Sequence, residues 1–262
     1  MQSHDCENKK RIVKLGGVTL GAGMPAVCVP VMGESIAALA AAAERARLAE
    51  ADVIELRMDS MDAMPDAAAA LEAIAAVKRA AESIPLLFTL RTQRDGGAGS
   101  ADAQAYEALL SGVIRAGACE AVDCELSVGE AAFARIAKLA KAHGVVLVGS
   151  SHEFGSIGDM RRAGEWLKRQ EELGADVCKA AVMTRDVHEA LCAMQVYAQA
   201  HEELCAPMIA IAMGPAGVMT RLCGACFGSC LTFGTAGEQS APGQIDAMKL
   251  RAALETVDAA LR

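Results

Sequence analysis

One lysine of this chain lies inside an apolar segment that has the length of a buried strand. The segment 174–183 reads Gly-Ala-Asp-Val-Cys-Lys-Ala-Ala-Val-Met, with Lys179 near its centre. Burial favours the neutral form of an amine, and a neutral amine can attack a carbonyl carbon to form an imine. The alternative is a lysine at a strand end whose ammonium group reaches water along its aliphatic stem. The segment alone leaves both interpretations open.

Charged and apolar residues alternate in the segment Val53 to Asp59. The two-residue period of a strand places Glu55, Arg57 and Asp59 on one face and apolar residues on the other. A charged face of this kind can bind a polar ligand, and an internal ladder of ion pairs would give the same pattern.

Further polar residues follow other apolar segments. Arg91 precedes a glycine-rich loop, and His152 follows the segment 145–150. A guanidinium suits carboxylate or hydroxyl ligands, and a histidine with a pKa of about 6.5 suits general acid-base work. Near the C-terminus stand Arg221 and the segment Ser240-Ala-Pro-Gly-Gln244, in which Ser240 could instead cap a helix.

These residues need a scaffold, and the chain alternates strand-like and helical segments eight times. Strands are expected at residues 26–31, 52–58, 86–91, 120–124, 145–150, 175–183, 207–213 and 229–233. Helices are expected at residues 35–50, 67–82, 101–116, 130–143, 158–173, 186–204, 217–222 and 243–261. Eight such units in 262 residues favour an α/β fold of the (β/α)8 TIM barrel type over an open doubly wound sheet.

Two short additions precede the barrel. Residues 1–10 are expected to form a polar tail, and residues 11–21 an N-terminal β-hairpin around Gly16-Gly17. No linker divides the chain, so residues 1–262 are expected to form a single domain. Because active sites of such barrels lie at the carboxyl ends of the strands, the polar residues above are expected to meet there.

Composition limits the functions open to the chain. With 53% hydrophobic and 22% charged residues it can bury a large core, and its net charge of -8 argues against a nucleic-acid partner. Neither a signal peptide nor a membrane span is expected from the sequence, which predicts a cytoplasmic protein. Ten cysteines then indicate free thiols, although Cys223, Cys226 and Cys230 have the close spacing of metal ligands.

Seven pieces of the sequence, in order, resemble the type I 3-dehydroquinate dehydratases of the shikimate pathway. The pieces are Glu55-Leu-Arg57, Arg91 followed by an acid and Gly-Gly, Ser151-His152, Gly174 to Lys179, Arg221 to Ser229, Thr232-Phe-Gly234 and Ser240 to Gln244. The resemblance implies a lyase that dehydrates 3-dehydroquinate to 3-dehydroshikimate, with Lys179 forming the Schiff base and His152 as general base and acid. It also implies that no metal or organic cofactor is needed, and that the enzyme is a homodimer.

The resemblance implies roles for the remaining polar residues. Arg221 would bind the substrate carboxylate, and the residues expected to hold the hydroxyl groups and the ring are Glu55, Arg57, Arg91, Ser240 and Gln244. Asp95 stands where many relatives have a glutamate that orients the histidine, and it is one methylene shorter. Pro30 stands where some relatives offer a serine, and its ring cannot donate a hydrogen bond.

Two other functions compete with the dehydratase. A class I aldolase or transaldolase also uses a lysine imine in a barrel, and it would need a phosphate site near the last strands, such as the turn Gly214-Pro-Ala-Gly217. A protein without enzymatic activity that binds a metal at the three cysteines is the other alternative, with Lys179 merely structural. Burial of the thiols as small apolar groups is the simpler interpretation of the cysteines.

Overall fold

Eight parallel strands form the centre of the molecule. The computed structural model describes residues 10–61, 65–155, 160–237 and 239–262. The strands are β3 (Ala26–Val31), β4 (Val53–Arg57), β5 (Leu86–Thr89), β6 (Ala121–Glu125), β7 (Val146–Glu153), β8 (Val177–Met183), β9 (Met208–Met213) and β10 (Leu231–Thr235). They pair in the order β10-β3-β4-β5-β6-β7-β8-β9. The barrel closes where the backbone N–H of Cys230 donates to the carbonyl of Met208 at 2.8 Å.

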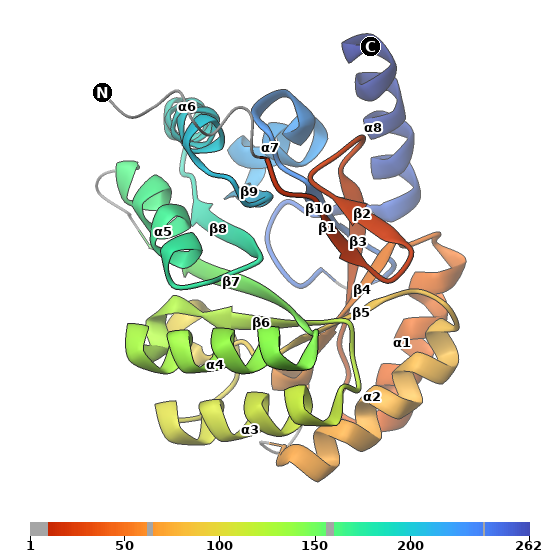
Figure 1. The fold of residues 1–262 in the computed structure, drawn as a ribbon. Coiled ribbons are helices and arrows are strands. Elements are labelled where there is room, and N and C mark those ends of the chain that lie inside the picture. Colours follow the sequence, from red (N-terminus) through yellow and green to blue (C-terminus); the bar gives the residue numbers. More distant parts are fainter. Residues whose placement is uncertain (1–9, 62–64, 156–159, 238) are drawn as a thin grey trace.

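Helices cover the outside of the strands (Figure 1). They are α1 (Ile36–Leu48), α2 (Ala67–Ala81), α3 (Ala103–Ala116), α4 (Glu130–His143), α5 (Arg161–Glu172), α6 (Val187–Glu203), α7 (Val218–Leu222) and α8 (Ala247–Leu261). Side chains of Ser35, Asp66, Asp102, Asp186 and Asp246 cap five of them by accepting a backbone N–H of the first turn. The predicted (β/α)8 barrel is confirmed, with each strand and helix near its expected place.

A hairpin covers the amino-terminal end of the barrel. Strands β1 (Val13–Leu15) and β2 (Val18–Leu20) pair antiparallel across Gly16-Gly17, as predicted. Leu15 and Leu20 are buried against apolar residues from the interior of the barrel, including Val53 and Val177. The predicted polar tail falls largely on residues 1–9, which lie outside the described residues. The predicted start of α5, Gly158, also lies outside them.

The interior of the barrel changes character along its axis. Near the hairpin it is apolar, and a separate apolar layer between strands and helices takes up Ile54, Leu56 and Met58 of the alternating segment. Towards the carboxyl ends of the strands, the inward side chains include buried Glu55, Arg91 and Lys179. These charged side chains thus lie at one end of the barrel, where strands β4 and β8 and the end of β5 position them. Across the described residues, no helix combines the length and apolarity needed to cross a membrane.

Candidate active site

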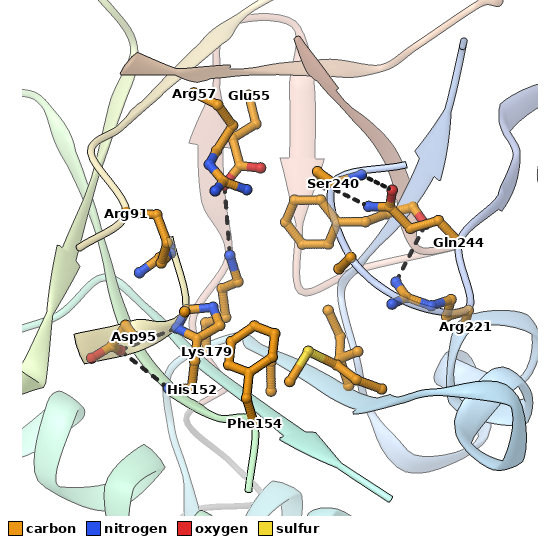
Figure 2. Close-up of a pocket in the computed structure, with 16 residues that line it drawn as sticks. Glu55, Arg57, Arg91, Asp95, His152, Phe154, Lys179, Arg221, Ser240 and Gln244 are labelled. Carbon is orange, nitrogen blue, oxygen red and sulfur yellow. Dashed lines mark hydrogen bonds and ion pairs between the residues drawn. The ribbon is translucent and has the colours of Figure 1, made fainter. Parts of the chain in front are cut away.

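A pocket opens at the carboxyl ends of the barrel strands (Figure 2). Its lining residues are Glu55, Arg57, Arg91, Asp95, Gly96, His152, Phe154, Lys179, Ala181, Ile211, Met213, Arg221, Phe233, Ser240, Ala241 and Gln244. Every residue that the resemblance gave a catalytic or binding role is in this set, whereas Asp59 of the predicted charged face is not. In Figure 2 the Lys179 amine lies between His152 on one side and the loop of Ser240 on the other.

Lys179 lies within β8 and is 4% exposed, so the interpretation as a strand-end lysine that reaches water is wrong. Its Nζ lies 3.7 Å from Glu55 Oε1 and 3.6 Å from Asp123 Oδ2. The ring of Phe233 covers the amine, with its centroid 4.5 Å from Nζ. The sequence predicted apolar surroundings, but the amine in fact has two carboxylates beside it. These carboxylates fix the position of the Lys179 side chain.

His152 contacts Asp95 on the side of the pocket away from Arg221 (Figure 2). Asp95 ends a short 3₁₀ turn (Gln93–Asp95), and its Oδ2 lies 3.2 Å from both Nδ1 and the backbone nitrogen of His152. The shorter side chain therefore reaches the histidine. Burial lowers the pKa of His152 well below its ordinary value, and the nearby charges of Arg91 and Lys179 lower it further. A neutral imidazole whose Nδ1–H donates to Asp95 has Nε2 free to accept a proton.

Arg91 is the centre of a buried network of charges. Its Nη1 donates to Glu125 Oε1 at 2.9 Å and to Ser150 Oγ at 3.0 Å, and its Nη2 donates to Asp123 Oδ2 at 2.8 Å. Burial opposes ionisation of Asp123, but Arg91 and Lys179 hold the pKa of its carboxyl at about 2. The guanidinium expected to meet a ligand thus also fixes the carboxylate beside Lys179.

The charged face of β4 contains an ion pair as well as pocket residues. Arg57 donates from Nε and Nη2 to both carboxylate oxygens of Asp59, each at 2.8 Å. Asp59 is not in the strand as predicted, because β4 ends at Arg57 and a 3₁₀ turn (Met58–Ser60) follows. Asp59 also accepts the backbone N–H of Arg91 and that of Ala98 at 3.2 Å, so it ties two pocket loops together.

Arg221 comes from α7 and is 1% exposed. Its Nη1 donates to the carbonyl of Phe233 at 3.5 Å and its Nη2 to that of Pro242 at 3.2 Å, while Nε has no partner. Within the described residues it forms no ion pair, and burial lowers its pKa to about 10. A buried guanidinium without a counter-ion is suited to bind an anion, because an anion would restore the lost solvation.

Ser240 and Gln244 hold each other at the pocket edge. The backbone N–H of Ser240 donates to Gln244 Oε1 at 2.8 Å, and Gln244 Nε2 donates to Ser240 Oγ at 2.9 Å. The side chain that caps α8 is Asp246, so the interpretation of Ser240 as a helix cap is wrong. Both residues are presented to the pocket by a loop.

The three clustered cysteines differ in their surroundings. Cys230 is buried in the barrel interior, Cys223 is half-buried and Cys226 is exposed. Burial raises the pKa of the Cys230 thiol to about 12. No group of three or more His, Cys, Asp or Glu side chains is arranged to hold a metal ion in the described part of the chain.

Sequence reasoning missed several residues of this site, among them the apolar lining residues Ala181, Ile211 and Met213. Asp123 and Glu125 follow the same two-residue alternation on β6 that identified the charged face of β4, so the same test would have found them. Ser150 and Phe154 gave no such signal. The ring of Phe154 lies over Gly96, where a Cβ would come within 2.0 Å of a ring carbon, so this contact depends on a glycine in a different loop.

A closed barrel with a buried lysine, a histidine and an unpaired arginine at the carboxyl ends of its strands defines a class of (β/α)8-barrel enzymes. Within that class, the family model of type I 3-dehydroquinase matches residues 27–260. The chain belongs to the type I 3-dehydroquinase family. This membership favours the dehydratase over the aldolase and over the metal-binding alternative.

Curated relatives and solved structures agree with the family. The chain is 36% identical over 246 residues to a 3-dehydroquinate dehydratase of Listeria welshimeri, covering 94% of this chain and 97% of that protein. The type I 3-dehydroquinate dehydratase of Clostridium difficile, solved with covalent modified comenic acid, has a TM-score of 0.91 at 30% identity and covers 96% of this chain and 99% of that one. The 3-dehydroquinate dehydratase of Geobacillus kaustophilus has a TM-score of 0.91 at 32% identity, with coverages of 96% and 98%.

Proposed function

We propose that this enzyme dehydrates 3-dehydroquinate to 3-dehydroshikimate through an imine on Lys179. The observation that carries the proposal is the buried amine of Lys179, which shares one pocket with His152 and with the unpaired guanidinium of Arg221. The substrate offers a ketone to the amine and a carboxylate to the arginine. Lys179 and Arg221 can therefore each bind a different functional group of the substrate.

The reaction proceeds in steps that these side chains support. The neutral amine of Lys179 attacks the ketone, and loss of water gives a protonated imine that draws electrons from the neighbouring carbon. His152 accepts a proton from that carbon, and the resulting imidazolium gives a proton to the departing hydroxyl group as the new double bond forms. Water then adds to the imine and releases the product, which regenerates the amine. Asp95 orients the imidazole through Nδ1.

The other polar residues position the ring. Arg221 binds the carboxylate, and the hydroxyl groups are held by Glu55, Arg57, Arg91, Ser240 and Gln244. Arg91 has a second role, because its terminal nitrogens also donate to the buried carboxylates of Glu125 and Asp123 and fix their positions. The Clostridium difficile relative, which has the same fold, was solved with covalent modified comenic acid, and this supports covalent chemistry in the family.

Formation of the product tests the activity. The dehydration creates a carbon–carbon double bond conjugated with a ketone and a carboxylate, and this chromophore absorbs in the ultraviolet. Purified protein mixed with 3-dehydroquinate should raise this absorbance in proportion to enzyme concentration. Addition of a chelator should not change the rate, because the proposed steps use protein side chains only. An absorbance that stays flat would refute the activity.

Replacement of Arg221 should weaken substrate binding. Arg221→Leu removes a charge-assisted contact to the substrate carboxylate at a buried position, where water cannot replace it. We therefore expect kcat/KM to fall about 10²-fold or more, mainly through a higher KM. Steady-state kinetics would measure the change. Arg185→Leu is a matched control, because Arg185 is an exposed residue that pairs with Glu189 in the next helix. An unchanged KM in Arg221→Leu would remove the arginine from carboxylate binding.

We further propose that residues 1–262 form one domain and that the enzyme is a homodimer. One sheet order runs through all barrel strands, and the apolar layer around it is continuous from α1 to α8. A single domain of this kind should unfold in a single transition.

The homodimer is tested by its mass. Light scattering should report about twice the chain mass of 27.1 kDa. The single-chain mass in light scattering would contradict the dimer.

A further inference from the structure

A buried glutamine contacts the backbone of Lys179 from outside the barrel. Gln170 lies on α5 and is fully buried. Its Oε1 accepts the backbone N–H of Lys179 at 2.9 Å, and its Nε2 donates to the carbonyl of Lys179 at 3.0 Å. The same Nε2 donates to Ser151 Oγ at 3.1 Å. One carboxamide therefore bonds both backbone groups of the lysine and the residue that precedes His152.

Strand β7 leaves room for this side chain. At Gly149, a Cβ would lie 3.1 Å from the Cβ of Gln170 and 2.8 Å from a ring carbon of Phe133. Both distances are tighter than ordinary contacts, so any larger residue at position 149 would push against Gln170 or the ring behind it. The glycine on β7 and the glutamine on α5 thus fit together beside the point where β7 and β8 carry His152 and Lys179.

The geometry constrains the lysine more than a packing contact would. The backbone N–H and C=O of a residue lie on the two peptide planes that flank its Cα. Bonds to both groups from one rigid amide fix these two planes, and with them the direction in which the Lys179 side chain leaves β8. The bond to Ser151 ties the same amide to β7, next to His152. An apolar side chain could fill the space but would leave three buried polar groups without these partners.

We propose that Gln170 is a positioning residue that sets the placement of the Lys179 amine relative to His152. This inference rests on the proposed imine mechanism and adds to it a residue that touches neither substrate nor reacting atoms. A displacement of about 1 Å of a reacting group can lower a rate by about 10²-fold, so loss of the amide should act on the chemical steps. Binding of the carboxylate by Arg221, across the pocket, should not change.

The test separates binding from chemistry. Gln170→Leu keeps the approximate volume and removes all three hydrogen bonds. We expect kcat to fall about 10- to 100-fold. Quinate is the alcohol that corresponds to the substrate ketone, and it cannot form an imine. Its affinity, measured by calorimetry, should stay within about twofold of that of the unsubstituted enzyme, because quinate binding involves no chemical step. Gln170→Glu, which when protonated keeps one donor and one acceptor, should recover part of the lost kcat.

A second variant controls for general loss of stability. Leu167→Ala makes a cavity on the same helix one turn earlier, at a fully buried residue of the apolar layer. Its melting temperature should fall, but its kcat below the melting range should stay within about twofold of the unsubstituted enzyme, because it leaves the Lys179 backbone intact. If Gln170→Leu and Leu167→Ala lose kcat in equal proportion to their melting temperatures, Gln170 is merely structural and the inference is overturned.

Borohydride treatment distinguishes this inference from the function on which it rests. If the unsubstituted enzyme forms no substrate adduct on Lys179, the imine mechanism fails and the role of Gln170 fails with it. If the unsubstituted enzyme forms the adduct and Gln170→Leu turns over at an unchanged kcat, only the role of Gln170 is refuted. Should quinate affinity and kcat fall together in Gln170→Leu, the pocket as a whole has been disturbed, and this too contradicts a specific positioning role.

Discussion

Lys179→Met should abolish dehydration, with kcat reduced on the order of 10⁴-fold or more, because the side chain keeps its approximate length but loses the nucleophilic nitrogen. In the unsubstituted enzyme, borohydride added with 3-dehydroquinate should reduce the imine and fix one substrate on Lys179 as a secondary amine. Peptide mass spectrometry would locate the added mass. The same treatment of Lys179→Met should leave the protein unmodified, while Lys138→Met, at an exposed position of α4, should behave as the unsubstituted enzyme.

The structure adds a stability check to this experiment. Glu55 and Asp123 lie within 3.7 Å of the amine, and removal of the cation leaves Glu55 without that partner, whereas Asp123 keeps Arg91. Melting should therefore be measured beside kinetics, since an unpaired buried carboxylate lowers the stability of a fold. A folded Lys179→Met protein with measurable turnover, or an adduct on any other residue, would refute the assignment of the nucleophile.

The order of strands and helices could be predicted because it depends on local patterns. Strand β3 and helix α4 match their expected ranges, since glycine residues bound the helix and the strand is continuously apolar. The inward face of β4 followed from the two-residue period alone, and Glu55 and Arg57 do point into the pocket. Placement at the carboxyl ends of the strands then brought the predicted site residues together. Fold and pocket composition were thus accessible from the sequence.

The connections between site residues could not be predicted in the same way. The partners of Arg91 on β6 and of His152 in the loop after β5 depend on which strands are neighbours and on how far each side chain extends. Asp95 illustrates the difference: its shorter side chain left open whether the loop would move in or the contact would weaken, and the 3₁₀ turn brings its carboxylate to 3.2 Å from the imidazole. Gln170 gave no signal at all, because a buried glutamine on a helix is identified only by the backbone groups that it meets.

His152→Ala should lower turnover by about 10²- to 10⁴-fold, the usual effect of removing a general acid-base group. The imine should still form, so borohydride should still fix the substrate on Lys179. This separates the base from the nucleophile, since Lys179→Met loses both turnover and adduct. His143→Ala, at an exposed position in the last turn of α4, is the matched control and should keep full activity.

The pH dependence of the unsubstituted enzyme tests the same residue. Burial and the charges of Arg91 and Lys179 lower the pKa of His152, so the free enzyme keeps the neutral, proton-accepting imidazole as the pH falls through 6.5. Because kcat/KM reports groups of the free enzyme, its acid limb should lie below pH 6.5 and should be absent from the residual activity of His152→Ala. An acid limb at or above pH 6.5, or one that persists in His152→Ala, would show that another group is the base and that the buried imidazole serves only to hold Asp95 in place.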